Sequence, residues 1–133
     1  MEAQIGRERM VIHQGDVFWI KPDGSDPSEA NYPHPHVVIQ EGTRNLSGIQ
    51  TVVVCALTTN RKRASLPGNV LLEVGEANLP RQSVVVVSRV LTIDKAQLGE
   101  YIGSLSRQRV DRILAGMRFV QRLTHHHETG DGS

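Results

Sequence analysis

The first two thirds of the chain carry short apolar runs rich in Val and Ile, separated by segments of Gly, Pro, Asn and Asp. Runs of this kind between turn residues are typical of β-strands. The pattern predicts five strands, at Val17–Ile20, Val37–Gln40, Thr51–Leu57, Val70–Val74 and Ser83–Ile93. Five strands so close in sequence indicate a small barrel or a coiled sheet. The stretch Pro22–Pro35, with four prolines among polar residues, is expected to be a surface loop.

The period of the pattern changes after Ile93. Asp94 is a suitable cap for a short helix over Lys95–Leu98, with Gln97 reaching back as in a capping box. A longer helix is predicted from near Ser106, because one stripe at helical spacing contains Val110, Ile113, Leu114, Met117, Val120 and Leu123. The other face carries arginines, which suit an acidic partner but more often form a solvated face: Arg107, Arg109, Arg112, Arg118 and Arg122.

Composition narrows the class of protein. A chain of 133 residues with 38% hydrophobic residues fits one domain. A net charge of +1 does not by itself indicate a nucleic-acid or membrane partner. The single Cys55 excludes a disulfide framework and a site of several thiolates, as expected in the cytoplasm. No apolar run is long enough to span a bilayer, and the charged residues at the start of the chain are not expected to act as a signal peptide. Residues 1–10 and 124–133 are expected to be flexible tails around a domain at 11–123.

Several enzyme classes lack their minimal parts, because the chain has no glycine-rich phosphate loop, no G-x-S-x-G turn and no H-E-x-x-H helix. The most suggestive polar cluster follows the third predicted strand, where hydroxyls and an amide run into three cations: Thr58, Thr59, Asn60, Arg61, Lys62 and Arg63. Cations attract a phosphodiester, and hydroxyls place hydrogen bonds on its oxygens. A solvated polar loop is the alternative interpretation.

Other candidate residues lie near the second and fifth strands. His34 and His36 are separated by one residue, so in an extended segment both imidazoles point to one side. They are candidates for proton carriers or for ligands of a metal with His13, and the alternative is that they are structural or surface histidines. Glu29 is a carboxylate in the same loop. The triplet Arg81, Gln82 and Ser83 offers a cation, an amide and a hydroxyl for phosphate and base contacts, or forms an ordinary turn. No metal site or cofactor is expected from these residues.

A series of short motifs runs in order from about Gln14 to Leu123. It begins with G-D-V-F-W at 15–19, continues with P-S-E at 27–29 before H-P at 34–35, and reaches an apolar strand that ends in L-T-T-N at 57–60. Later segments are L-P-G-N-V at 66–70, L-P-R-Q-S-V at 79–84, L-T-I-D-K at 91–95 and I-G-S-L at 102–105. Taken together and in this order, the motifs resemble the MazF/PemK/Kid family of toxins.

The resemblance implies a mainly β fold with a C-terminal helix (α+β), a small, partly open SH3-like barrel that usually forms a homodimer. It implies a toxin of a type II toxin–antitoxin system, a metal-independent endoribonuclease that cuts single-stranded RNA at short sequences. The nucleophile is the 2′-hydroxyl of the RNA, so the protein has only to move protons and stabilise the phosphate. A cognate antitoxin is the expected partner, and operator DNA is expected to bind only through that complex.

Residue by residue, the family's catalytic threonine corresponds to Thr58 and its arginine to His34, with Glu29 and Ser83 in support. Arg61, Lys62, Arg63 and Arg81 are expected to hold the RNA, helped by His36, Thr59, Asn60 and Gln82. His34 is the main departure, because arginine stays charged whereas histidine is mostly neutral near pH 7. The substitution leaves two hypotheses, an enzyme that uses an imidazole or an impaired scaffold that binds RNA or an antitoxin.

Overall fold

The computed structural model describes residues 11–21, 33–41 and 50–132, with residues from 124 onward as backbone only. Six strands precede one long helix in this part of the chain. The strands are β1 (Asp16–Ile20), β2 (His34–Val38), β3 (Thr51–Thr58), β4 (Val70–Leu72), β5 (Ser83–Asp94) and β6 (Leu98–Ser104). The helix is α2 (Arg107–Gly132), and short 3₁₀ turns are η2 (Arg61–Ser65), η3 (Glu76–Asn78) and η4 (Lys95–Gln97).

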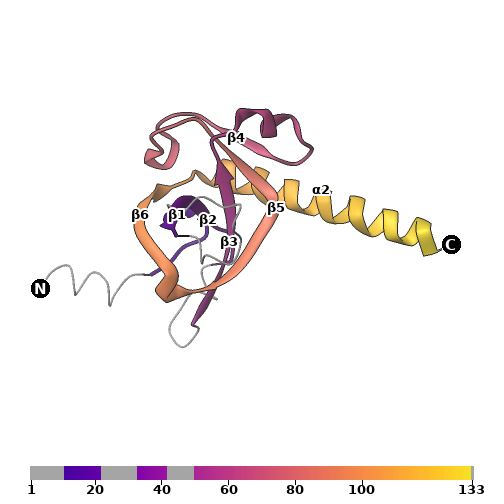
Figure 1. Ribbon diagram of the computed structural model, residues 1–133, viewed down its shortest axis with the longest axis horizontal. Coiled ribbons are helices and arrows are strands. Elements are labelled where there is room, and N and C mark those ends of the chain that lie inside the picture. Colours follow the sequence, from indigo (N-terminus) through magenta and orange to yellow (C-terminus); the bar gives the residue numbers. More distant parts are fainter. Residues whose placement is uncertain (1–10, 22–32, 42–49, 133) are drawn as a thin grey trace, which may run out of the picture.

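The strands form one antiparallel sheet in the order β4-β5-β3-β2-β1-β6, so β4 and β6 remain its two edges. In Figure 1 the sheet curls around β1 and β2, and α2 crosses one side before it runs away from the barrel. The long strand β5 pairs with β3 from Thr51 to Thr58, with a register shift between Cys55 and Leu57, an irregularity of the kind that bends a strand. The expected fold class, a partly open small barrel with a C-terminal helix, is confirmed.

Two hydrophobic clusters occupy the two faces of the sheet. Successive side chains of a strand point to opposite faces, so Val17 joins one cluster and Phe18 the other. The first cluster includes Val110 and Ile113 of α2, which therefore covers that face, whereas the second is built around Phe18, Val52 and Val54. Valine supplies much of both clusters, as expected from a chain with 4% aromatic residues.

All five predicted strands are present, with boundary differences of a few residues, but β6 is a sixth strand that the apolar pattern does not reveal. Its sequence, LGEYIGS, has two glycines and a mostly exposed face, which hides the strand signal. The predicted loop ends earlier than expected, because His34 and Pro35 already pair with Ile20 and Trp19 in β2. The capping box at Asp94 is confirmed, with the Asp94 amide donating to Gln97 Oε1 at 3.0 Å.

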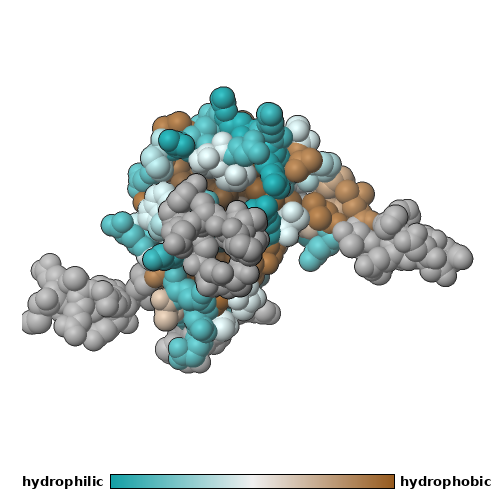
Figure 2. Space-filling model, viewed as in Figure 1, coloured by the Kyte–Doolittle hydropathy of each residue, from teal (hydrophilic) through white to brown (hydrophobic). Residues whose placement is uncertain are grey.

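The helix differs from the prediction at its end. Val110 and Ile113 are buried as expected, but Leu123 at the end of the stripe is 51% exposed. The backbone stays helical to Gly132, so the expected tail from residue 124 begins as a continuation of α2. Once a helix is nucleated, each added residue gains a backbone hydrogen bond without a tertiary contact. Figure 2 shows hydrophobic side chains along the part of α2 that leaves the sheet.

Arg109 also departs from the predicted solvated face. Its guanidinium donates to both carboxylate oxygens of Glu76, with Nε to Oε1 at 2.9 Å and Nη2 to Oε2 at 3.0 Å. Both side chains are about one quarter exposed, at 25% each. The pair lowers the pKa of Glu76 through the hydrogen bonds from Arg109. This contact fastens α2 to η3, so here the basic face of the helix is part of the tertiary structure.

The Gly15-Asp16 pair has a structural role at the start of β1. Gly15 adopts a φ of 100°, a left-handed conformation that favours glycine. The buried carboxylate of Asp16 accepts from the His13 amide at 2.8 Å and from Ser104 Oγ at 2.7 Å. The side chain thereby stabilises the turn into β1 and joins it to β6 at the far end of the sequence.

Candidate functional site

A groove of about 950 Å³ lies where the ends of several strands meet. Its residues come from β1 and β2, from the end of β3 and the turn after it, from the segment before β5, and from β6. Segments far apart in sequence therefore share one cavity, which is the usual setting for a site on a small β scaffold. Its apolar floor includes Leu57 and Leu79, both buried.

One wall is formed by the end of β3, where the predicted cluster begins. Thr58 is the last residue of the strand and pairs with Val84, and Thr59 and Asn60 continue the same wall. The Thr58 hydroxyl accepts from the Asn60 amide at 3.2 Å. A hydroxyl that accepts this bond still has its own proton to donate, so Thr58 can donate to an oxygen of a ligand in the groove.

Arg81 and Ser83 line the groove beside this wall. Arg81 is exposed and takes part in no ion pair among the residues that the structure describes. Ser83 is only 2% exposed, and its hydroxyl donates to the Arg81 carbonyl at 2.9 Å. Ser83 therefore shapes the turn that carries Arg81, and Arg81 is the cation that the groove offers to an anion on this side.

His34 lines the groove as expected, but His36 does not. His36 is 7% exposed, pairs with Phe18 and Ala56 in the sheet, and has Nδ1 3.0 Å from the His34 carbonyl oxygen. Burial lowers the pKa of His36, and this effect outweighs the hydrogen bond to that carbonyl, which raises it. A neutral imidazole with a satisfied Nδ1–H is a structural residue, so the expected RNA contact of His36 does not fit its position.

The three consecutive cations lie beyond the groove wall, on the 3₁₀ turn η2. Asn60 caps this turn, because its side-chain oxygen accepts from the Lys62 amide at 3.1 Å. Arg61 donates to Gln82 at 3.3 Å, and Gln82 donates to Glu73 at 2.7 Å. The cations and Gln82 thus form a basic surface next to the groove and are not part of its lining. The remaining candidate, Glu29, lies outside the described residues.

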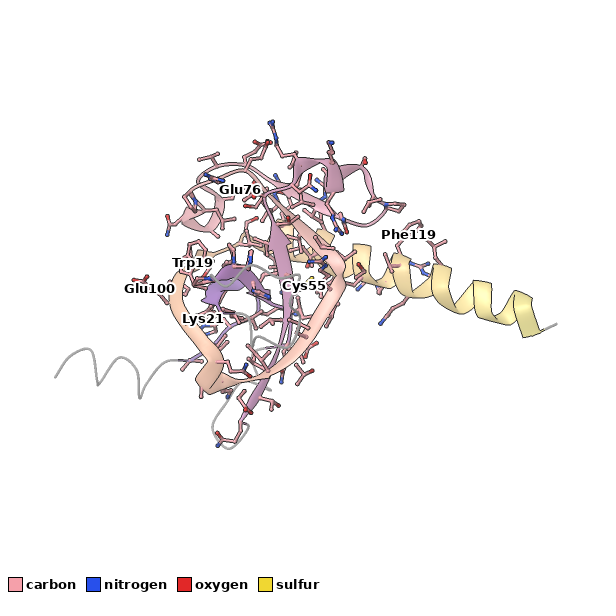
Figure 3. All side chains as sticks on the ribbon, viewed as in Figure 1. Trp19, Lys21, Cys55, Glu76, Glu100 and Phe119 are labelled. Atoms are coloured by element: carbon pink, nitrogen blue, oxygen red, sulfur yellow. The ribbon has the colours of Figure 1, made fainter. Side chains whose placement is uncertain are left out.

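The groove has a second wall, none of whose residues the sequence analysis proposed as a site residue. It consists of Trp19 and Lys21 at the end of β1 and of Gln97, Gly99 and Glu100 around the start of β6. Figure 3 shows Trp19, Lys21 and Glu100 on the same side of the barrel. Two of these residues, Gly99 and Glu100, belong to β6, the strand that the sequence pattern does not reveal. The one available signal is Trp19, which is the single tryptophan of the chain.

The groove combines groups that suit a phosphodiester. Thr58 supplies a hydroxyl donor, His34 an imidazole and Arg81 a permanent positive charge, all on the lining of one cavity. The described residues contain no group of three or more His, Cys, Asp or Glu side chains placed to hold a metal ion. In residues 11–21, 33–41 and 50–132, no helix has the length and apolar character needed to cross a membrane.

Comparisons with known proteins agree on one family. Residues 13–120 match the family described as PemK-like, MazF-like toxin of type II toxin–antitoxin system. The endoribonuclease MazF2 of Mycobacterium bovis is 33% identical over 117 residues, which cover 86% of this chain and all of that protein (100%). Endoribonuclease EndoA of Bacillus subtilis is 29% identical over 104 residues, covering 78% of this chain and 89% of its own.

Solved structures agree in fold. An endoribonuclease in complex with its cognate antitoxin from a mycobacterial species superposes with a TM-score of 0.67 at 22% identity, covering 84% of this chain and 95% of that one. MazF of Deinococcus radiodurans superposes with a TM-score of 0.67 at 17% identity, covering 84% and 96%. At these identities the similarity concerns the fold.

Proposed function

Since this chain belongs to the PemK-like, MazF-like toxin family of type II toxin–antitoxin systems, we propose that it is the toxin of such a system and an endoribonuclease. Its substrate is single-stranded RNA, cut at a short sequence without a metal ion. The observation that carries this proposal is the groove that joins Thr58, His34 and Arg81. These residues come from three separate parts of the sequence, and together they provide what cleavage of a phosphodiester requires.

The proposed reaction uses the RNA as its own nucleophile. The 2′-oxygen bonds to the adjacent phosphorus while the bond from phosphorus to the 5′-oxygen breaks, leaving a 2′,3′-cyclic phosphate and a 5′-hydroxyl. One proton leaves the 2′-hydroxyl and one arrives at the 5′-oxygen. No protein nucleophile is needed, so the protein acts by proton transfer and by stabilising negative charge on the phosphate.

Each groove residue has a role that suits its chemistry. Arg81 places a positive charge beside the phosphate, which compensates for the absence of arginine at position 34. Thr58 donates a hydrogen bond to a phosphate oxygen, while its contact with the Asn60 amide holds the hydroxyl in place. His34 is the group that transfers a proton near neutral pH. Arg61, Lys62 and Arg63 extend the positive surface along the RNA backbone.

The partners are proposed on the same basis. A relative has been solved with its cognate antitoxin, and we expect an antitoxin to bind and silence this chain as well. A homodimer accords with exposed apolar side chains on β5 and α2, namely Val90, Leu91, Phe119 and Leu123. Operator DNA is expected to bind only through the antitoxin complex, and the cytoplasm is the expected location. Sedimentation of the purified chain, alone and with the antitoxin, tests both assemblies.

The decisive experiment maps cuts in a long unstructured RNA by primer extension with a chelator present. The native chain is compared with Thr58→Val, which keeps the shape and removes the hydroxyl, and with the control Thr51→Val at the other end of β3, away from the groove. We expect discrete cuts by the native chain and by Thr51→Val. Loss of one hydrogen bond to the phosphate is expected to slow Thr58→Val about 100-fold or more. Equal rates for the two variants would refute the role of Thr58.

The variant His34→Arg distinguishes between two hypotheses, that the chain is an active enzyme and that it is an impaired scaffold. If His34 transfers protons, the native rate changes with pH between about 5 and 9, and His34→Arg loses that dependence. A native chain that makes no cuts, together with cutting by His34→Arg, would instead identify a scaffold that only binds RNA or an antitoxin.

A further inference from the structure

The pairing of β1 with β6 is irregular at the groove. Phe18 pairs with Tyr101 and Ile20 pairs with Leu98, so the single residue Trp19 faces two residues of β6, Gly99 and Glu100. This is a β-bulge, a device that redirects a side chain and is frequent beside functional sites. Gly99 is required here, because a Cβ at this position would lie 2.5 Å from the Trp19 carbonyl oxygen.

The bulge brings Glu100 to the same face as Trp19. The rings of Phe18 and Tyr101 meet at 5.6 Å between centroids, so these two neighbours share one face of the sheet. Since side chains alternate along a strand, Trp19 and Glu100 both point to the opposite face. Both residues line the groove, as does the exposed Lys21.

The chemistry of this wall differs from that of the wall with Thr58 and Arg81. An indole is a platform on which a nucleobase stacks, a contact that does not depend on the sequence. An ionised carboxylate only accepts hydrogen bonds, so Glu100 discriminates among bases by their donors. Glu100 takes part in no ion pair among the described residues. A phosphate would be repelled by this carboxylate, whereas a base with adjacent donors would bind it.

We propose that Trp19 and Glu100 form a nucleobase subsite that selects guanine in the RNA next to the cleaved phosphate. Guanine presents two neighbouring donors, N1–H and the N2 amino group, which match the two oxygens of a carboxylate. Adenine and cytosine each present an amino group beside an acceptor nitrogen, and uracil presents one N–H between two carbonyl oxygens. Lys21, at the rim of the same wall, neutralises the phosphate of the selected nucleotide.

This inference deepens the proposed function and rests on it for the identity of the ligand as RNA. Its test needs no cleavage, because Trp19 is the single tryptophan and its fluorescence reports stacking in this subsite alone. The probe is a short oligouridine with 2′-O-methyl groups, which removes the nucleophile, carrying guanosine, inosine, adenosine or cytidine at one position. Inosine keeps N1–H and lacks the amino group, so it removes one of the two proposed contacts.

For the native chain we expect fluorescence quenching with about tenfold tighter binding of the guanosine probe than of the adenosine and cytidine probes, and an intermediate affinity for the inosine probe. In Glu100→Gln this preference falls below about twofold. The matched control is Glu41→Gln, which removes the same charge at an exposed position outside the groove and keeps the preference. A carboxylate that acted only by repulsion would give tighter binding of all probes in Glu100→Gln with the preference unchanged.

Absence of quenching, equal binding of all probes by the native chain, or an unchanged preference in Glu100→Gln would each overturn the subsite. Primer extension on unmodified RNA judges the proposed function separately. Discrete cuts without a guanine preference would leave the nuclease in place and refute the subsite. A guanine preference in fluorescence without any cuts would support the subsite and refute the nuclease.

Discussion

The contact between α2 and the turn before β4 allows a sharp test of how the helix is held on the barrel. Gly116 of the helix lies against the backbone of Gly68, and a Cβ at 116 would collide with the Gly68 carbonyl oxygen far inside van der Waals contact. Gly68 has a φ of 85°, so this turn has little freedom to move. We therefore expect Gly116→Ala to push α2 away from the turn.

Two effects of Gly116→Ala oppose one another. Alanine is a better helix former than glycine by about 1 kcal/mol, which stabilises the variant. Overpacking against backbone atoms costs about 1–3 kcal/mol and sometimes more, because backbone cannot rotate aside as a flexible side chain does. Displacement of α2 also weakens the packing of Val120, which lies against the first hydrophobic cluster. The clash and the weaker packing together dominate, and we expect a net loss of about 1–2 kcal/mol.

Urea unfolding followed by circular dichroism measures this change at one fixed protein concentration, since association would shift the midpoint. Ala115→Gly is the control, because Ala115 is the exposed neighbour of Gly116 and reports helix propensity without the contact. We expect the control to lose about 1 kcal/mol. A Gly116→Ala variant as stable as the native chain, or more stable, would refute the reasoning from the close approach.

Three further predictions concern stability and reactivity. Arg109 lowers the pKa of Glu76, so the pair contributes fully to the free energy of unfolding above the usual carboxyl pKa near 4.5. That contribution is lost as the pH falls through the lower pKa of the folded state. Glu76→Gln should therefore cost about 1–2 kcal/mol at pH 7 by urea unfolding, and the difference should shrink towards pH 3. Asp16→Ala should cost about 2 kcal/mol in the same assay, because the hydrogen bonds from the His13 amide and the Ser104 hydroxyl to the buried carboxylate are lost, whereas full stability would contradict that account. Burial raises the pKa of Cys55 to about 12, so iodoacetamide at pH 8 should label the thiol only after unfolding in urea, and rapid labelling of the folded chain would disprove its burial.

The sequence alone determined those features that depend on neighbours along the chain. Alternation and β-branched content located five strands, helical spacing located α2, and the capping box at Asp94 followed from two residues three positions apart. These signals are local, because each is produced by backbone conformation and by the face that an element buries. The order of short motifs also identified the family, which the match over residues 13–120 confirms.

Only the tertiary structure decided which polar residues meet. His34 and His36 are equivalent in the sequence pattern, yet one lines the groove and the other is buried against β1, because strand pairing on both sides encloses His36. The wall with Trp19 and Glu100 depends on a register shift between β1 and β6, and no local pattern specifies a register between strands so distant in sequence. The groove is therefore a product of long-range pairing, whereas the elements that build it are products of local pattern.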